Sequence, residues 1–527
     1  MLSLPSALDR TLRLHGARPA IVDAERTFTW RQFADRVARA AGLLKQLGIE
    51  RGDRFGIVSR NTFRHAELIT AGYWMGAVPV PVNIRLAPPE IGFILKDADC
   101  RIVAIEDVFW DLAGSDALAP WRGRLLYVSP DRAAHDVAQY EALLATAEPA
   151  QLADAAEDDD AILLYTGGTT GRSKGVRLTH RNVVSNGMQM AHHWRVRSDD
   201  IYLHIPPMFH SADLLGTAFT LVGGAHAYLP QFSGEAALKA IEDYRVTIAM
   251  FAPTMVIMTL QVENLADYDL SSFRNLFYGS SPMAVEWVKR TMDAFKGVEI
   301  QQGYGLTETS PILTTLSPED HIRALDSGDY SRLKAAGRPL IGIDMRIVDD
   351  DDNEVPIGEV GEVVVRGPNV TKGYLNRPED NEKAFRDGWF HTGDVGRMDK
   401  QGYMYLMDRK KDMIITGGEN VYSSEVEAVL YQHPGIFEVA VIGVPDSKYG
   451  EALFAAIVPA PGVELCEDEV IEHCRGRIGG YKIPRRMAFV DELPKSALGK
   501  ILKTELRRIH GRQVDALRNR VSSSGKG

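Results

Sequence analysis

The strongest constraint on the fold is a repeated alternation between helical and strand patterns over the first part of the chain. From Trp30 to Leu47 the apolar side chains recur every three or four residues, the spacing of one helix face. The stretch "DRFGIVSRN" then has the apolar run of a short buried strand, "AELITAGYWMGA" returns to a helical pattern, and "VPVPVN" is extended. This alternation predicts an α/β fold with mostly parallel sheets covered by helices.

The pattern changes after about residue 340. The segment "DMRIVDDDDNEVPIGEVGEVVVRG" predicts a strand, a solvated acidic turn and a second strand, so we expect a β-rich lobe over about 340–408. Beyond the charged "DRKKD" linker, the remaining residues have their own helix–strand–helix pattern, long enough for a small domain. The sequence therefore predicts a large N-terminal domain, 1–408, and a small, mobile α+β domain, 409–527.

Composition narrows the class of protein. A net charge of −11 argues against a nucleic-acid-binding protein, although small anionic ligands respond to local charge instead. Three cysteines provide neither a disulfide framework nor a metal-ligand cluster. The start of the chain lacks the pattern of a signal peptide, and no run of 18 apolar residues occurs. We therefore expect a cytoplasmic protein without a transmembrane segment.

The stretch "LLYTGGTTGRSKGV", residues 163–176, follows an apolar strand pattern and has the composition of an anion-binding loop. Its glycines allow a tight turn that brings backbone N–H groups near a ligand, and its hydroxyls and one lysine add donors and positive charge. The spacing does not match a Walker A loop. Taken alone, the loop suits nucleotide binding and a mobile linker equally. The residues concerned are Thr166, Gly167, Gly168, Thr169, Thr170, Gly171, Ser173 and Lys174.

Seven further motifs decide between these alternatives. In this order and at these distances, they resemble the ANL adenylating enzymes, which include acyl-CoA synthetases, peptide-synthetase adenylation domains and firefly-type luciferases. The resemblance extends from roughly residue 20 to 505. Two loop positions depart from the usual family pattern, because Gly167 replaces Ser and Ser173 replaces Pro. The motifs are "HRN" (180–182), "PPMFH" (206–210), "YGSSP" (278–282), "QGYGLTET" (302–309), "DGWFHTGD" (387–394), "DRKKDMIITGGENV" (408–421) and "PKSALGK" (494–500).

The resemblance implies a two-step ligase reaction that uses ATP, Mg²⁺ and coenzyme A. A carboxylate attacks the α-phosphate of ATP to form an acyl-adenylate and pyrophosphate, and a thiol then displaces AMP. By resemblance, the loop from Thr166 to Lys174 cradles the β- and γ-phosphates, Glu308 holds Mg²⁺, and Thr307 contacts the α-phosphate. Without the family setting, Thr307 and Glu308 would be typical of an ordinary helix start.

The resemblance also places the nucleoside. The "YGSSP" motif, with Gly279, Ser280 and Ser281, would lie beside the adenine. Tyr304 would stack on the ring, and Asp394 and Arg409 would bind the ribose hydroxyls. Outside this context a tyrosine beside a turn is usually a core residue, and an aspartate in "TGD" is usually a turn residue. Two glycines that flank the tyrosine, Gly303 and Gly305, complete the predicted set.

The C-terminal motifs imply a movable domain. Lys500 would bridge the carboxylate and the α-phosphate during the first step, although a lone lysine is usually only a solvated charge. A rotation about a hinge at Lys411 would then remove it. Gly417 and Gly418, otherwise a plain turn, would line the pantetheine tunnel after that rotation. His210 would have a positioning role at the junction of the acyl and thiol channels.

The acid is identified less sharply. The segment "FHSADLLGTAFTLVGG" is apolar, and Gly216, Ala218, Gly223 and Gly224 are expected to leave room for an acyl chain. No arginine lies beside "YGLTET" to pair with a second carboxylate. A dicarboxylate such as malonate is therefore not expected. The apolar character of the segment favours a medium- or long-chain fatty acid. An aryl or phenylpropenoid acid fits almost as well, with Asp213 as a partner for a ring hydroxyl.

Other functions remain open at this point. An adenylating enzyme that loads a separate carrier protein would carry the same motifs. A catalytically silent relative would have lost a catalytic residue, but Lys174, Glu308, Asp394, Arg409 and Lys500 are all present. Relatives often form homodimers, so a second copy of the chain is the one protein partner that we expect.

Overall fold

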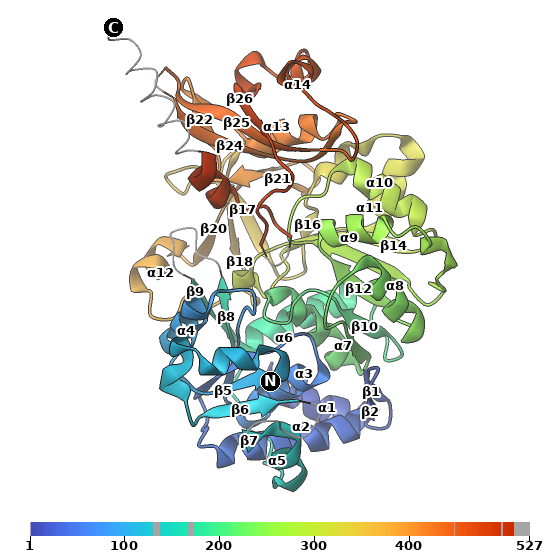
Figure 1. Ribbon diagram of the computed structural model, residues 1–527, viewed down its shortest axis with the longest axis vertical. Helices are drawn as coiled ribbons and strands as arrows, with labels where there is room; N and C mark the ends of the chain where they lie inside the picture. The colour runs from blue at the N-terminus through green and yellow to red at the C-terminus, as the bar shows by residue number, and fades with distance from the viewer. Residues whose placement is uncertain (1, 130–137, 167–172, 447, 497–498, 511–527) are drawn as a thin grey trace. The chain divides into compact units, whose positions relative to one another are not determined.

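The computed structural model describes residues 2–129, 138–166, 173–446, 448–496 and 499–510 (Figure 1). The chain forms two compact units, which we describe separately. The first comprises Met1–Pro282, Lys289–Asp344 and Val365–Phe390, and the second comprises Met283–Val288, Met345–Val364 and His391–Gly527. The expected domain boundary at 408/409 stays a prediction.

The first unit is built on a nine-stranded sheet and confirms the expected α/β class. Its central strands are parallel, and antiparallel strands complete both edges. Ligand sites in such sheets lie beyond the carboxyl ends of the parallel strands. In order across the sheet, the strands are β16 (Arg338–Pro339), β15 (Thr314–Leu316), β14 (Glu299–Tyr304), β13 (Asn275–Gly279), β12 (Ile248–Phe251), β10 (Ile201–His204), β11 (Ala225–Tyr228), β1 (Pro19–Val22) and β2 (Thr27–Thr29).

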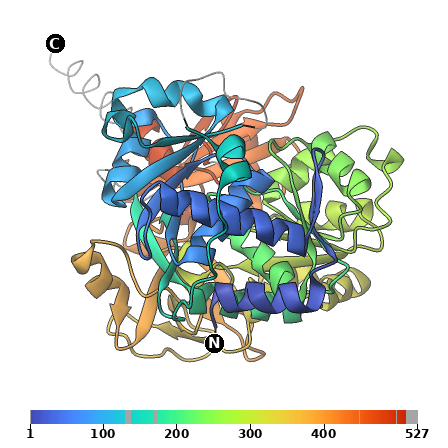
Figure 2. The same cartoon turned by 90° about the horizontal axis from the view of Figure 1, so that it is seen from below.

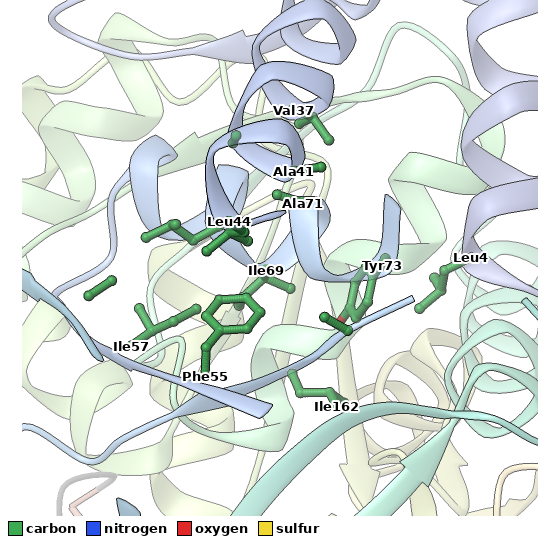
Figure 3. Close-up of a cluster of buried hydrophobic side chains, with 14 of the residues drawn as sticks. Leu4, Val37, Ala41, Leu44, Phe55, Ile57, Ile69, Ala71, Tyr73 and Ile162 are labelled. Atoms are coloured by element: carbon green, nitrogen blue, oxygen red, sulfur yellow. The ribbon is translucent and has the colours of Figure 1, made fainter. Parts of the chain in front are cut away.

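A second, all-parallel sheet of the same unit contains the strands expected in "DRFGIVSRN" and "VPVPVN". Its order is β4 (Val78–Pro81), β3 (Arg54–Val58), β5 (Cys100–Glu106), β6 (Leu125–Val128) and β7 (Ala138–Gln139). Figure 3 shows side chains from this sheet, including Phe55 and Ile57, packed with residues of the neighbouring helices in one buried cluster.

The helix expected from Trp30 is α2, Trp30–Gln46, and its first turn has a capping box. The Thr29 hydroxyl accepts from the Gln32 N–H at 3.3 Å, and the Gln32 side chain accepts from the Thr29 N–H at 2.9 Å. The N-terminal helices, in dark blue, lie toward the viewer in Figure 2. The other helices are α1 (Leu4–His15), α3 (Phe63–Met75), α4 (Pro88–Asp97), α5 (Tyr140–Thr146), α6 (His180–His193), α7 (Thr217–Val222), α8 (Gly234–Asp243), α9 (Pro253–Leu260), α10 (Val285–Ala294), α11 (Pro318–Ser327), α12 (Pro378–Ala384), α13 (Ser423–Leu430) and α14 (Glu467–Cys474).

The glycine-rich loop joins the two strands of a hairpin, β8 (Asp160–Thr166) and β9 (Lys174–Thr179). The apolar strand expected before the loop is therefore confirmed. Thr166 and Lys174 are the last paired residues of the hairpin. The predicted phosphate contacts at Gly167, Gly168, Thr169 and Thr170 lie outside the described residues.

The β-rich segment after residue 340 forms a five-stranded sheet, and the division between the units passes through three of its strands. Its order is β17 (Asp344–Val348), β18 (Gly361–Arg366), β20 (Trp389–Met398) and β19 (Phe385–Arg386), with β21 (Met404–Arg409) paired to β20. The C-terminal sheet has the order β23 (Glu419–Val421), β22 (Ile414–Thr416), β25 (Gly450–Pro459) and β24 (Ile436–Asp446), with β26 (Arg486–Phe489) paired to β25. The apolar faces of α13 and α14 pack on this sheet around Val426 and Val470.

Candidate functional site

Two predicted motifs, "YGSSP" and "QGYGLTET", lie at the carboxyl ends of the neighbouring parallel strands β13 and β14, so they meet at one edge of the large sheet. Gly279 at the end of β13 is paired with Gly303 on β14. A Cβ atom on Gly279 would lie 2.6 Å from the Gly303 carbonyl oxygen, which explains why glycine is required there. Ser280 follows with φ +73°, a left-handed conformation that is uncommon for serine. This strained turn presents Ser281, and the half-buried Tyr304 ends the adjacent strand.

The predicted phosphate and magnesium residues lie on a short 3₁₀ turn, η5 (Thr307–Thr309). The Thr307 hydroxyl is 3.1 Å from that of Ser211, which follows the "PPMFH" motif. The Glu308 carboxylate accepts a hydrogen bond from the Tyr374 hydroxyl at 2.8 Å, and the backbone carbonyl oxygen of Glu308 accepts from the Thr371 N–H at 2.7 Å. A single positioned carboxylate suits Mg²⁺, which takes one or two carboxylates together with phosphate oxygens and waters.

Asparagines on α6 hold the loops behind this turn. The Asn182 amide donates to the carbonyl oxygens of Pro368 and Val370, each at 2.8 Å. One helical turn later, the Asn186 amide donates to the Ile312 carbonyl oxygen at 2.9 Å. The "HRN" triplet at 180–182 was a visible signal, but sequence reasoning gave these amides no role. They support the site and do not add a reactive group to it.

Lys174 has a partner that no motif predicted. Its ammonium lies 2.6 Å from the Asp380 carboxylate on α12 and over the Tyr374 ring, 5.3 Å from the centroid. The pairing brings the end of the glycine-rich hairpin to the segment that contacts Glu308. Sequence reasoning missed Tyr374 and Asp380 because they are some 200 residues from Lys174 along the chain.

Within the second unit, three predicted site residues come together. Arg409 Nε lies 3.0 Å from an Asp394 carboxylate oxygen, and the two residues are paired across β20 and β21. Asp394 is almost fully buried, whereas Arg409 keeps about a third of its side chain exposed. Lys500 interacts electrostatically with both. Desolvation by surrounding protein atoms, and then the like charge of Arg409, lower the pKa of Lys500 to about 8, although the residue is exposed to solvent by its surface area.

Two hydrogen bonds join Ser496 to Lys500. The Ser496 N–H donates to the Lys500 carbonyl oxygen at 2.7 Å, and the Lys500 N–H donates back to the Ser496 hydroxyl at 3.2 Å. Gly499 has φ +73°, a conformation that favours glycine. These contacts hold the backbone of Lys500 against Ser496.

The predicted hinge and tunnel residues also lie in tight turns. Lys411 lies in the turn between β21 and β22, where desolvation lowers its pKa. Gly417 and Gly418 have φ +62° and +86°, and they form the two-residue turn of the β22–β23 hairpin. Two positive φ values in succession make glycine favourable there whatever the loop binds. The roles in domain rotation and pantetheine binding stay predictions.

His210 follows a loop that Asn61 holds. The Asn61 amide donates to the carbonyl oxygens of His204, Ile205 and Pro206, and its own oxygen accepts from the Met208 N–H. Desolvation, and then the positive charge of Arg85, lower the pKa of His210 to about 4. A neutral imidazole with so low a pKa is a weak base at neutral pH, which is consistent with a positioning role.

The glycines expected to leave room for an acyl chain do not do so. A Cβ atom on Gly216 would lie 2.6 Å from His204, and one on Gly223 would lie 2.3 Å from His15. At Gly224 a Cβ atom would lie 3.0 Å from the Asp200 carbonyl oxygen. The expectation was wrong at these three positions, because the space beside each glycine is filled by other parts of the protein.

His204, which fills the space at Gly216, belongs to a buried chain of hydrogen bonds. Its Nδ1 is 2.5 Å from the Asp213 carboxylate and its Nε2 is 2.9 Å from His226 Nδ1, whose Nε2 is 3.1 Å from the Thr220 hydroxyl. Burial, and then His204, lower the pKa of His226 well below its ordinary value, so this imidazole is neutral. One arrangement satisfies every link: Thr220 donates to His226, His226 to His204, and His204 to Asp213. Asp213 therefore already has a partner within the protein.

Replacing Asp213 by alanine is expected to lower the free energy of unfolding by about 3 kcal/mol or more, because it leaves a buried histidine without its acceptor. Urea unfolding followed by circular dichroism would measure this. Asp213→Asn, which keeps an acceptor oxygen, should cost clearly less. Equal stability of wild type and Asp213→Ala would show that the chain of hydrogen bonds contributes nothing to folding.

A membrane-spanning helix and a metal-binding cluster are both absent from the part of the chain that the structure describes. No helix there combines the length and the apolar character needed to cross a bilayer. Nor do three or more His, Cys, Asp or Glu side chains gather there as a metal-binding group.

Comparison with known proteins gives a consistent result. Residues 8–375 match the family model for AMP-binding enzymes, and residues 425–500 match the model for the AMP-binding enzyme C-terminal domain. A feruloyl-CoA synthase of an Amycolatopsis species is 38% identical, with 95% of this chain and 98% of that protein covered. A long-chain-fatty-acid–CoA ligase of Mycobacterium tuberculosis is 37% identical, with 91% and 92% covered. The crystal structure of ATP-bound MatB from Rhodopseudomonas palustris superposes with a TM-score of 0.87 at 31% identity, covering 96% of this chain and 99% of that one.

Proposed function

This chain belongs to the AMP-binding enzyme family, and we propose that it joins a compact, ring-bearing carboxylic acid to coenzyme A. The chain is an AMP-forming acid–CoA ligase that uses ATP, Mg²⁺ and coenzyme A. Its ring-acid substrate is the new element of the proposal.

The packing around Gly216 supports a compact acid. The His204 ring occupies the space beside this glycine, and the hydrogen bonds to Asp213 and His226 hold the ring in place. A long alkyl chain would need an apolar channel, and a rigid polar group is a poor lining for one. The feruloyl-CoA synthase, at 38% identity, is a relative whose named product carries such a ring acid.

The residue roles follow from the chemistry of phosphoryl transfer. Charge develops on phosphoryl oxygens in the first step, so the step requires cations and donors aimed at them. We assign Lys174 and Thr166 to the β- and γ-phosphates, Thr307 to the α-phosphate and Glu308 to Mg²⁺. Asp394 and Arg409, held together at 3.0 Å, suit the two hydroxyls of a ribose. Lys500 supplies the movable positive charge of the first step, and Gly417 and Gly418 border the thiol in the second.

The test is AMP release with ATP, Mg²⁺ and coenzyme A over a panel of acids. The panel contains benzoate, cinnamate and ferulate, C8 to C16 fatty acids, acetate and malonate. We expect kcat/KM for cinnamate or ferulate to exceed that for the C16 acid at least about tenfold, since a few missing apolar contacts already give such ratios. Faster turnover of the C16 acid would overturn the ring-acid proposal and leave the ligase reaction intact.

A medium- or long-chain fatty acid is the second candidate. The 37% identity to a long-chain-fatty-acid–CoA ligase supports it, as does the apolar character of the segment after His210. It predicts a rate that rises with chain length in the same panel. Transfer to a separate carrier protein in place of coenzyme A would appear as AMP release that does not depend on coenzyme A.

A further inference from the structure

The carboxylate that holds Lys174 has no assigned role in the reaction. The Asp380 carboxylate lies 2.6 Å from the Lys174 ammonium. The Asp380 side chain keeps 33% of its surface exposed, and the Lys174 side chain keeps 21%. The pair is therefore accessible to solvent and to solutes. Any phosphate that binds Lys174 must share the ammonium with Asp380 or replace it.

Asp380 is carried on a rigid piece of the first unit. The Asn381 side chain accepts from the Tyr374 N–H at 2.7 Å and donates to the Tyr374 carbonyl oxygen at 3.0 Å, which locks α12 to the segment before it. That segment pairs with β9, because the Arg177 N–H donates to Gly373 and the Leu375 N–H donates to Gly175. Figure 1 shows α12 near the two strands of the hairpin. Asp380 is thus held in register with the strand that begins at Lys174.

The same piece reaches the predicted magnesium ligand. The Tyr374 hydroxyl donates to Glu308 at 2.8 Å while its ring lies beneath the Lys174 ammonium. A polyphosphate at Lys174 therefore approaches two carboxylates, Glu308 and Asp380. Mg²⁺ held by Glu308 would offset the charge of that carboxylate, but Asp380 keeps its negative charge and opposes the phosphate.

We propose that Asp380 lowers the affinity of the enzyme for ATP and pyrophosphate by competing with their phosphates for Lys174. The inference rests on the proposed role of Lys174. A competing carboxylate weakens the binding of both the triphosphate and the pyrophosphate product, so it also speeds release of that product. Because the ion pair is partly exposed, the effect is modest, about two- to fivefold in affinity.

The test compares Asp380→Asn with wild type by calorimetric titration of ATP and of pyrophosphate, and by steady-state kinetics. We expect the Kd for both ligands and the KM for ATP to fall about two- to fivefold, with the KM for the acid and for coenzyme A unchanged. The gain should shrink at high salt, since exposed charges are screened. Glu379→Gln is the matched control, because it removes one exposed acidic charge from the same helix turn and should leave the Kd for ATP unchanged.

Two outcomes would overturn the inference. The first is a rise in the Kd for ATP in Asp380→Asn, which would make Asp380 a positioning residue. The second is a Kd for ATP that is the same in Asp380→Asn and in Glu379→Gln. Lys174→Ala separates this failure from failure of the proposed site. If Lys174→Ala leaves ATP binding intact, the assignment of Lys174 to the phosphates is wrong. If Lys174→Ala weakens ATP binding and abolishes the effect of Asp380→Asn in the double variant, the competition is confirmed.

Discussion

Lys500→Ala is expected to slow formation of the acyl-adenylate at least about 100-fold, because removing a group aimed at developing charge typically has an effect of this size. Thioester formation from a supplied acyl-adenylate should stay within about threefold of wild type, since the proposed role of the lysine is confined to the first step. ATP–pyrophosphate exchange measures the first half-reaction, and single-turnover transfer to coenzyme A measures the second. The two measurements together separate a catalytic loss from a folding defect.

Lys495→Ala is the matched control for this prediction. Lys495 lies in the same motif, and its ammonium is 2.7 Å from Glu438. We expect the control to retain nearly full activity in both half-reactions, because Lys495 is paired with Glu438 and has no proposed role in either step. An equal loss in both half-reactions of Lys500→Ala, or an equal loss in the control, would contradict the assigned role.

The pKa of Lys500 adds a pH dependence to the same prediction. A lysine whose pKa is lowered to about 8 is protonated below that pH and neutral above it. The value of kcat/KM for ATP, which reports the free enzyme, should therefore fall as the pH rises through about 8. Lys500→Arg keeps its charge throughout this range, so whatever activity it retains should not decline there. Parallel declines in the two proteins would assign the titration to another group.

Glu308→Gln is expected to reduce the rate of adenylate formation about 100-fold or more and to raise the Mg²⁺ concentration needed for half-maximal rate. The amide oxygen can still accept from the Tyr374 hydroxyl, so the local hydrogen bond survives while the negative charge is lost. A hard cation binds far more weakly to a neutral amide than to a carboxylate. Magnesium titrations of the exchange reaction would measure both effects.

Tyr374→Phe is the comparison for Glu308→Gln. It removes the hydroxyl that donates to Glu308 but leaves the carboxylate and the ring beneath Lys174. We expect a loss of only a few-fold, because the charge that attracts Mg²⁺ is unchanged. An unaltered magnesium requirement in Glu308→Gln would remove Glu308 from the metal site.

Much of the fold follows from local pattern. The helix from Trp30 was predictable because its apolar spacing and its Thr29 capping box are both encoded within a few residues. The strand before the glycine-rich loop and the hairpin strands after residue 340 were predictable for the same reason. The family resemblance then supplied the order of the motifs, and with it the reaction class.

The glycines show where local pattern fails. Gly216 and Gly223 are small residues in an apolar segment, and small residues next to a predicted channel indicate free space. Only the packing shows that His204 and His15 occupy that space. Close packing in protein interiors leaves little room unfilled, so the size of a residue does not reveal which neighbour fills the gap.

The sequence alone determined the α/β class and the strands that flank the glycine-rich loop, because periodicity and turn residues act over short distances. The groups that could perform the chemistry were identified by the resemblance of the motifs to a known family. The tertiary structure decided which of those groups meet. It paired Lys174 with Asp380, Glu308 with Tyr374, and His204 with Asp213. Two of these pairs join residues far apart in the chain, and all three depend on how strands and turns pack. Charge and hydrogen-bonding partners at the site are therefore properties of the folded chain.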